Sequence, residues 1–462
     1  MNLLMTQRME SMQPLSTLNT LFLFLAEMVN GNSCEMIAID GNVDAVILAE
    51  AMQDVVAAHP HLRTQIVKKG RRYYKVPAAN LIRIPIEERH FTGGVDELNR
   101  FLSDNIWCTS PIDVFQGPPL RIILTRADRK THLQVLSSHV WSDAKAGYLL
   151  LNDIVEAYNC RVVGRSPQLS QRDNRGLDFD GALQARLAAM EHVYSRKAVL
   201  KSLCRDFFNS GGSTSVKRAD RYQSRFSTTV IGDDAFIQQL KAAGRAAGVT
   251  IHSVLVAALT KALHQHDERR GRDKSHYRIH DMFSLRSHVD GFGDMYDCCV
   301  LPFDFDCDWL PASEARLVSN SRALAAIKQG RIFDEYFKIK FMLELLHHLP
   351  RPLASRLALQ YLVNGNVLCT NPGIIPFDYP RMENAPITDF YSFSQVFPPG
   401  QLMFVFTTFR QSFRLATVYN EFAVTAAEVQ TIINDVVTEL RCMIVELAPR
   451  KSSADMRSVS IA

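Results

Sequence analysis

The chain has 462 residues, of which 47% are hydrophobic and 22% are charged. This composition is typical of a globular protein and excludes disordered, collagen-like and coiled-coil chains. Its 52 basic and 48 acidic side chains leave a formal charge of +4, which is too small and too dispersed for a nucleic-acid partner. The length predicts two or three domains, or one tightly coupled pair.

The nine cysteines form an odd set without a C-x-x-C spacing, so neither a disulfide framework nor a four-cysteine zinc site is expected. The apolar run from Leu21 to Ala26 is followed by Glu27 and is too short to span a bilayer, so it predicts a core helix. Residues 304–308 imitate a calcium loop, but Trp309 stands where glycine is needed. We therefore expect a cytoplasmic protein with no transmembrane segment and no bound metal.

Strands and helices alternate from the start of the chain. The periodicity predicts a strand over 35–39, a helix over 43–58 that Pro60 stops, a hairpin of strands 61–67 and 72–76, strands over 120–124 and 131–136, and a helix over 144–158. The basic turn Lys68-Lys69-Gly70-Arg71-Arg72 joins the two strands of the hairpin. This mixed order predicts an α/β fold.

A polar stretch over 163–181, a helix over 183–208 and a Gly/Ser break at 210–214 predict a bridge between two halves. The second half is expected to contain a strand over 222–231, a helix over 234–247 ended by Gly248, a helix capped by Thr250 that runs to 263, strands near 280–285, 300–305, 367–369, 402–409 and 413–418, and a helix over 426–447. We expect an N-terminal half (1–165), a bridging segment (166–220), a C-terminal half (221–449) and a disordered tail (450–462).

One segment carries candidate chemistry. Ser138-His139-Val140-Trp141-Ser142-Asp143-Ala144 places a histidine four residues before an aspartate, at the junction of a predicted strand and a predicted helix. Loops at strand ends are where a rigid scaffold presents reactive groups. An imidazole has a pKa near working pH and can accept and return a proton. His139 is therefore the candidate catalytic residue.

This segment resembles the H-H-x-x-x-D-G signature of the superfamily that contains chloramphenicol acetyltransferase, peptide-synthetase condensation domains and plant-type acyl-CoA acyltransferases. Further resemblances follow in the family's order, over about residues 35 to 425: His59-Pro60-His61-Leu62-Arg63 ("RHPxLR"), Phe115-Gln116-Gly117-Pro118-Pro119-Leu120-Arg121 ("GPPLR"), residues 248–255, Phe283-Ser284-Leu285-Arg286-Ser287 with 292–295 ("vnLR…fGNm"), and Thr370-Asn371-Pro372-Gly373 ("SNxGxxP").

The resemblance implies two similar chloramphenicol-acetyltransferase-like halves, each a mixed sheet flanked by helices, with an active-site tunnel at their interface. His139 would be the general base, taking a proton from an acceptor hydroxyl or amine as it attacks the thioester carbonyl of the donor. Asp143 would form a structural ion pair with Arg286. The candidates for oxyanion stabilisation or for lining the tunnel are Thr370, Asn371, Trp141 and Ser142. For Asn371 a turn before Pro372, and for Trp141 a core position, stay open as alternatives.

The sequence departs from the family pattern at several places. Ser138 replaces the first histidine, Ala144 replaces the glycine, and the late element at 408–415 lacks its glycine. The "DFGWG" element of the plant enzymes is also missing, with residues 388–393 at that place, which points toward condensation-like or wax-ester-synthase-like relatives. These departures leave open a catalytically degenerate domain that binds a carrier protein or a partner enzyme.

The resemblance implies an acyltransferase that moves an acyl group from acyl-CoA or a phosphopantetheine thioester to a small-molecule hydroxyl or amine, in secondary metabolite (natural-product) or lipid-conjugate biosynthesis. Hydrolysis of the thioester by water is a further alternative. We expect no tightly bound cofactor, a monomer, and an acyl or peptidyl carrier protein as a candidate partner. Candidate contacts for a CoA phosphate are Lys68, Lys69, Arg269 and Arg270.

Overall fold

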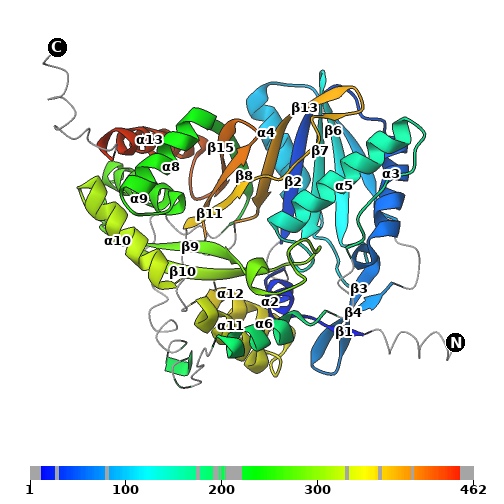
Figure 1. Ribbon diagram of the computed structural model, residues 1–462, viewed down its shortest axis with the longest axis horizontal. Helices are drawn as coiled ribbons and strands as arrows, with labels where there is room; N and C mark the ends of the chain where they lie inside the picture. The colour runs from blue at the N-terminus through cyan, green and yellow to red at the C-terminus, as the bar shows by residue number, and fades with distance from the viewer. Residues whose placement is uncertain are drawn as a thin grey trace, which may run out of the picture.

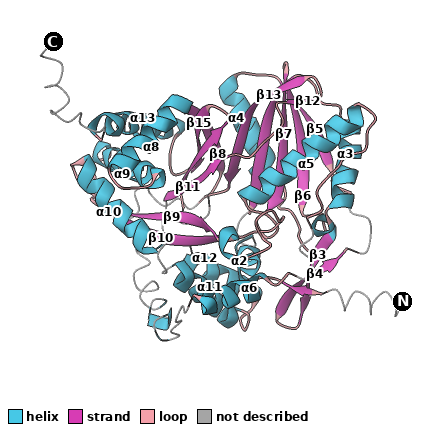
Figure 2. Cartoon of the chain, in the orientation of Figure 1, coloured by secondary structure: helices cyan, strands magenta, loops and turns pink. Residues whose placement is uncertain are grey.

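The computed structural model describes residues 12–26, 31–78, 83–172, 177–190, 197, 199–201, 203, 221–327, 332–362, 367–396 and 400–447. Within them lie two six-stranded mixed sheets and one small three-stranded sheet. The two large sheets stand side by side with helices over their faces, as Figures 1 and 2 show. The predicted α/β fold of two similar halves, each a mixed sheet flanked by helices, is confirmed.

The first large sheet lies mainly in the N-terminal part of the chain. In spatial order its strands are β12 (Arg381–Met382), β13 (Ala385–Ser394), β2 (Asn32–Asp40), β7 (Lys130–Ser138), β6 (Leu120–Ala127) and β5 (Ile86–Phe91). All neighbours are antiparallel except β5 and β6, which are parallel. The hairpin β6–β7 turns at Asp128, whose φ of 51° lies in the left-handed region.

The second large sheet belongs entirely to the C-terminal part. Its order is β10 (Val300–Asp308), β9 (His276–Ser284), β11 (Val367–Ile374), β14 (Leu402–Phe409), β15 (Ser412–Asn420) and β8 (Ser224–Asp233). Strand β11 runs parallel to both β9 and β14, and the other pairs are antiparallel. The small sheet has the order β1 (Gln13–Pro14), β4 (Arg72–Pro77), β3 (Thr64–Lys69).

Helices begin where polar caps allow them. The α-helices are α2 (Thr17–Ala26), α3 (Ala45–Ala58), α4 (Val95–Trp107), α5 (Ala144–Val162), α6 (Phe179–Ala189), α8 (Asp234–Ala246), α9 (Ile251–Arg269), α10 (Ser313–Ala326), α11 (Ile332–Leu346), α12 (Arg351–Leu362) and α13 (Ala426–Glu446). Asp44 caps α3 by accepting from Val46 N, and Thr250 caps α9 by accepting from Ser253 N, as predicted for Thr250. Gly248 ends α8 with a φ of 68°.

Some sequence predictions need correction. The strand predicted from His61 begins only at Thr64, because Pro60–Arg63 forms a 3-10 turn, and a second such turn covers Arg286–His288. The helix predicted over 183–208 begins earlier, as α6, which spans Phe179–Ala189. Residues 197, 199–201 and 203 of the same segment are also helical, and its other residues after Met190 lie outside the described ones. The predicted break at 210–214 and the tail from 450 also lie outside them.

One membrane-related observation concerns helix length. In the part of the chain that the structure describes, no single helix is long and apolar enough to cross a bilayer, although the bent pair α8 and α9 meets the length and hydropathy criteria jointly.

The C-terminal part of the chain contributes strands to the first sheet. Strand β13, from late in the chain, pairs antiparallel with β2 in the first sheet, while β14 and β15 return to the second. At the join, Phe393 of β13 stacks on Phe226 of β8 with ring centroids 4.7 Å apart, and Trp107 of α4 lies 5.9 Å from Phe393. These rings are buried in one apolar cluster, which packs β13 of the first sheet against β8 of the second.

This cluster yields a stability prediction. We expect Phe393→Ala to lower the free energy of unfolding by about 3–5 kcal/mol, because it leaves a cavity between the two sheets. Urea denaturation measures the loss, and Phe422→Ala, at a ring that is 50% exposed, serves as the control with a much smaller effect. If both variants lower the free energy of unfolding by the same small amount, this packing does not hold β13 in place.

Candidate active site

The segment 138–144 forms the turn between β7 and α5. Strand β7 ends at Ser138, and α5 begins at Ala144. Asp143 is the N-cap of α5, where its Oδ1 accepts a hydrogen bond from Ala146 N at 3.0 Å. A tight strand-to-helix turn therefore places His139 between a central strand of the first sheet and a capped helix N-terminus.

A backbone hydrogen bond and burial together define the tautomer and the neutral state of His139. Its Nδ1 lies 3.0 Å from the backbone oxygen of Ser142. A carbonyl can only accept, so Nδ1 carries the proton and Nε2 keeps its lone pair. Burial lowers the pKa of His139 below its ordinary value, a shift that the Ser142 carbonyl and the Asp143 carboxylate only partly oppose. The side chain is thus a neutral imidazole at pH 7 with its basic nitrogen pointing away from the turn's carbonyl.

An aromatic ring covers one face of this imidazole. Phe22 of α2 stacks on His139 with ring centroids 4.9 Å apart and planes inclined by 25°. The run from Leu21 to Ala26, predicted as a core helix, is the second half of α2, and its residues up to Leu25 are buried. Its position against His139 was not predicted, because hydrophobic periodicity identifies a buried face without naming what it contacts.

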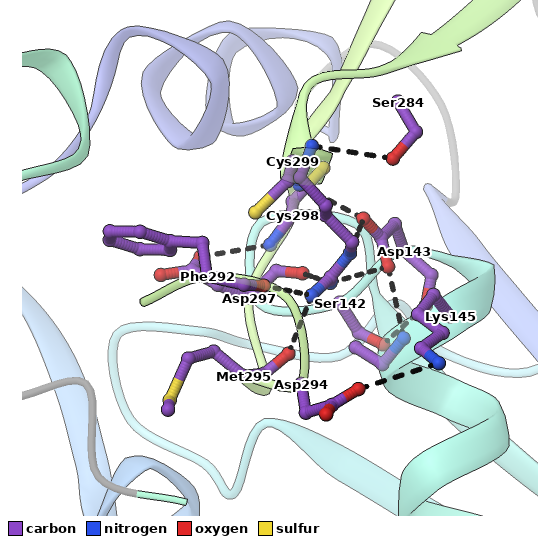
Figure 3. A network of polar contacts seen from close by, with 12 residues as sticks. Ser142, Asp143, Lys145, Ser284, Phe292, Asp294, Met295, Asp297, Cys298 and Cys299 are labelled. Atoms are coloured by element: carbon purple, nitrogen blue, oxygen red, sulfur yellow. Dashed lines mark hydrogen bonds and ion pairs between the residues drawn. The ribbon is translucent and has the colours of Figure 1, made fainter. Parts of the chain in front are cut away.

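Asp143 and Arg286 form a buried, bidentate ion pair between the two halves. Arg286 Nη2 donates to Asp143 Oδ1 at 2.7 Å, and Nε donates to Oδ2 at 3.1 Å. Only 2% of Asp143 and 7% of Arg286 is exposed. Figure 3 shows Asp143 at one side of this network, where its Oδ2 also accepts from Cys299 N. The charged atoms of both side chains therefore have hydrogen-bond partners in place of water, as a buried ion pair requires.

Arg286 also organises the loop that follows it. Its Nη1 donates to the carbonyls of Phe292 and Met295, each at 2.9 Å, and its Nη2 donates to that of Asp297 at 2.6 Å. Burial alone would lower the pKa of Arg286, but the Asp143 carboxylate outweighs it, so that the pKa is raised and the guanidinium stays charged. One side chain therefore shapes the segment that supports the far side of the site.

A second buried ion pair lies under the His139 turn. Lys75 Nζ contacts Asp297 Oδ2 at 3.0 Å, and Asn19 Nδ2 donates both to Asp297 Oδ1 and to the carbonyl of Val140, each at 2.8 Å. Lys75 also lies over the ring of Trp141, 5.2 Å from its centroid. Asn19 thus joins this ion pair directly to the residue after His139.

A third group of polar contacts is centred on Asp153 of α5. His59 Nε2 contacts Asp153 Oδ2 at 3.0 Å, and Tyr296 donates to the same oxygen. Burial alone would raise the pKa of Asp153, but hydrogen bonds from His59 and Tyr296 hold it below its usual value. His59, from the "RHPxLR" segment, is fully buried, so this element secures α3 to α5 and to the loop that Arg286 shapes.

A buried acid near Asp143 was not found by sequence reasoning. Glu35 of β2 is 2% exposed, and burial raises its pKa to about 8, with the charge of Asp143 adding to the shift and a hydrogen bond from Ser392 opposing it. A Cβ on Gly147 would lie 2.3 Å from the Glu35 carboxyl carbon. Gly147 in α5 therefore leaves the space that this protonated carboxyl fills.

The remaining candidate residues are placed as follows. Ser142 is buried, and its hydroxyl donates to the Asp143 carbonyl. Trp141 is 2% exposed and packs edge-on against His61, which is a core position. Thr370 and Asn371 lie at a bulge of β11, where Asn371 Oδ1 accepts from Gly373 N at 3.1 Å. Among the described residues, no hydrogen bond joins this bulge to the His139 turn. The hydrogen bond of Asn371 is one that stabilises a turn.

Two cavities lie close to residues that hold the His139 turn. The larger has a volume of about 580 Å³, and its lining residues include Asn19, Lys75 and Asp297. A small cavity of about 20 Å³ lies against Trp141 and Ser142. His139 itself is half-buried and lines neither of these two cavities. Asn19 and Thr20 of α2 line the larger cavity, while Phe22 of the same helix stacks on His139.

The four candidate phosphate contacts fall in two basic stretches with different surroundings. Arg269 pairs with Asp435, and Arg270 pairs with Glu428, so these arginines fasten α9 to α13. Among the described residues neither Lys68 nor Lys69 forms an ion pair with a carboxylate. No cluster of three or more possible metal ligands occurs in the described part of the chain.

Comparison with known proteins decides the family. A sequence model of the condensation domain matches residues 10–271, more than half of the chain and including the whole His139 turn. The chain belongs to the condensation domain family. No curated protein sequence compared with it gives a significant match.

Solved structures agree with this assignment at the level of the fold. The epimerization domain of the third module of tyrocidine synthetase B superposes with a TM-score of 0.66 at 15% identity, over 95% of this chain and 98% of that one. The X-domain from teicoplanin biosynthesis gives 0.63 at 16%, over 95% and 96%. The starter condensation domain of rhizomide synthetase, in complex with C8-CoA and Leu-SNAC, gives 0.63 at 13%, over 96% of each chain.

The buried pair predicts a large loss of stability on neutralisation. We expect Asp143→Asn to lower the free energy of unfolding by about 3–5 kcal/mol, because it leaves the Arg286 guanidinium buried without its counter-charge. Urea denaturation measures this loss. Asp294→Asn, which breaks the exposed Lys145–Asp294 contact in the same network, should cost less than about 1 kcal/mol. Similar small losses would contradict a structural role for the pair.

Glu35 predicts a pH-dependent stability. With a folded pKa of about 8, well above its unfolded value, Glu35 holds a proton that the unfolded chain releases. Stability from this group is therefore full at low pH and is lost as pH rises toward 8. Between pH 5.5 and 7.5 the wild-type free energy of unfolding should fall by on the order of 2 kcal/mol relative to Glu35→Gln. If Glu35→Gln shows the same pH dependence of the free energy of unfolding as the exposed control Glu50→Gln, then Glu35 is ionised in the folded protein.

Proposed function

We propose that this condensation domain catalyses acyl transfer from a thioester to a hydroxyl or amine, with His139 as the general base. The observation that carries the proposal is the fixed tautomer of His139, whose Nδ1 proton is engaged by the Ser142 carbonyl and whose Nε2 is left basic. The lowered pKa keeps that nitrogen unprotonated at neutral pH.

The proposed reaction needs one proton carrier. Nε2 removes the proton from the acceptor O–H or N–H as that atom forms a bond to the thioester carbonyl carbon. The tetrahedral intermediate then breaks its C–S bond, and the imidazolium returns the proton to the leaving thiolate, so that ester or amide and free thiol are released. The residues that orient the base are Ser142 through its carbonyl and Asn19 through the carbonyl of Val140.

We propose that the donor is a thioester on phosphopantetheine, presented by a carrier protein or as acyl-CoA, and that the chain acts in secondary metabolite biosynthesis. Membership of the condensation domain family supports the carrier-bound form. The C8-CoA complex of the rhizomide starter domain supports a CoA thioester as a substitute on the same fold. We also propose the two-half division near 166–220, with Asp143 and Arg286 as the structural pair that joins the halves.

A second candidate function is binding of a carrier protein without chemistry. Two observations favour it: Phe22 covers one face of the His139 ring, and the larger cavity does not reach that ring. The structural neighbours include an epimerization domain and an X-domain beside condensation domains, so this fold serves more than one function.

Thiol release separates the candidates. Purified protein given a panel of acyl-CoA and acyl-pantetheine thioesters with amine and alcohol acceptors should release free thiol, and His139→Ala should lower kcat/KM at least 100-fold, the usual contribution of a general base. Circular dichroism and the unfolding midpoint check that the variant stays folded. Equal rates in both proteins would overturn the role of His139, and thiol release that needs no acceptor would indicate hydrolysis.

The pH profile of the reaction gives a further test. Because burial places the pKa of His139 below its ordinary value near 6.5, kcat/KM should rise with pH through a pKa under 6.5 and be constant above it. Phe22→Leu, which removes the stacked ring and admits water, should move that pKa upward. A profile that rises through a pKa above 7 would contradict a buried neutral base.

A further inference from the structure

The β3–β4 hairpin turn and the α11–α12 turn lie against each other on the lower side of the view in Figure 1. Arg71, in the hairpin turn, donates from Nη1 to His348 Nδ1 at 2.6 Å. Arg351 of α12 lies over the ring of Tyr73 of β4, 5.9 Å from its centroid, and the centroid of the His347 ring lies 6.0 Å from that of the same ring. Contacts on both sides of the helical turn therefore hold it beside the hairpin.

Three leucines of the helical turn face solvent. Leu345 lies in the last turn of α11, Leu349 lies between the helices and Leu353 lies in the first turn of α12. Their exposed fractions are 53%, 38% and 46%. None of the three lines either of the two cavities described above, so these side chains lie on an outer surface and are not part of a pocket wall.

The hairpin turn places positive charge beside these leucines. Lys68, Lys69 and Arg71 are exposed, and within the described ranges no ion pair joins them to a carboxylate. The other basic stretch of the chain differs, because Arg269 and Arg270 pair with carboxylates of α13. The formal charge of the whole chain is only +4, so attraction of an anionic partner depends on this local concentration of charge.

The pKa of His347, between the hairpin and the leucines, reflects the same concentration of charge. Burial lowers this pKa most, and the charges of Arg72 and Lys68 lower it further, while the charge of Glu344 opposes them. The basic side chains of the hairpin therefore lie close enough to the α11–α12 turn to act on it electrostatically.

We propose that this surface is where the chain docks on a bilayer with anionic headgroups, lying on the bilayer without spanning it. We call it the basic leucine surface, and its residues are Lys68, Lys69, Arg71, Leu345, Leu349 and Leu353. Leucines of a peripheral membrane contact enter the boundary between headgroups and acyl chains, and neighbouring Lys and Arg side chains are attracted to anionic headgroups. The proposal concerns where the chain acts and does not depend on acyl transfer by His139.

Other anionic partners fit this surface less well. The strongest contacts of protein interfaces are enriched in Trp, Tyr and Arg, and leucine is under-represented among them. Single-stranded nucleic acids stack their bases on accessible aromatic rings, whereas the ring of Tyr73 beside this surface is only 4% exposed. Exposed leucines beside unpaired basic side chains are the combination that a charged lipid surface complements.

Sedimentation with vesicles tests the charge of the surface. The full chain is mixed with vesicles of phosphatidylglycerol and phosphatidylcholine, or of phosphatidylcholine alone, at 50 and 300 mM salt. We expect binding to the anionic vesicles only, and weaker binding at the higher salt. Lys68→Glu/Lys69→Glu should lower the partition coefficient at least ten-fold, since each basic residue near an anionic surface contributes about five-fold. The control Arg129→Glu/Arg245→Glu changes the net charge equally at two exposed arginines and should have a much smaller effect.

Fluorescence tests the apolar part of the contact. Leu349→Trp adds a reporter whose emission should be quenched by phosphatidylglycerol with brominated acyl chains. Val46→Trp, at a residue of α3 that is 70% exposed, keeps the same native tryptophans and should not be quenched further. Leu345→Ala/Leu353→Ala should lower the partition coefficient at least five-fold, because it removes apolar groups that enter the bilayer.

Any of four results would overturn the proposal. These are no binding of the wild-type chain to anionic vesicles, the same loss in both charge-reversal variants, equal quenching of Leu349→Trp and Val46→Trp, and binding of an acidic protein or single-stranded DNA that depends on Lys68 and Lys69 while vesicles do not bind. Circular dichroism checks that each variant stays folded. His139→Ala should bind vesicles as the wild-type chain does, so failure of the acyl-transfer proposal and failure of this one are separate results.

Discussion

The bidentate pair between Asp143 and Arg286 is the interaction on which the rest of the site depends. Asp143 belongs to the first half and caps α5, while Arg286 belongs to the second half and gathers the carbonyls of the loop after it. Removing either charge would leave the other buried without compensation. The pair therefore fixes three things at once: the start of α5, the path of the 292–297 loop, and the distance between the two halves at the His139 turn.

The chemistry proposed for His139 follows from this arrangement. Because α5 is capped at Asp143, the preceding carbonyl of Ser142 points at Nδ1 and selects the tautomer. Because the 292–297 loop is held by Arg286, Asp297 lies where it can pair with Lys75 and accept from Asn19. The proposed base is thus oriented by backbone groups that are themselves positioned by two buried ion pairs, so no carboxylate needs to contact the imidazole.

Sequence alone indicated the candidate turn at 138–144 but not its surroundings. The strand, the helix and the His-x-x-x-Asp spacing were legible because they are local, and Arg286 was identified only through a family resemblance. Phe22, Asn19, Lys75 and Glu35 come from elements more than 60 residues away from the turn, and their convergence depends on tertiary packing that periodicity does not encode. Strand β13 was missed for a similar reason. Its alternating polar residues are typical of many surface segments, and only the pairing with β2 makes it a strand.

The late position of β13 in the chain has a consequence for synthesis of the first sheet. Strand β2 is complete once residue 40 has been synthesised, yet one of its two neighbours, β13, ends at Ser394. During synthesis the first sheet therefore exposes an open edge of backbone N–H and C=O groups until almost the whole chain has emerged. Such long-range pairing delays folding, because the entropy of closing a loop of this length is lost before the contact forms. The two halves resemble separate domains in architecture, but the sheet of the first half is completed only by strands from the second.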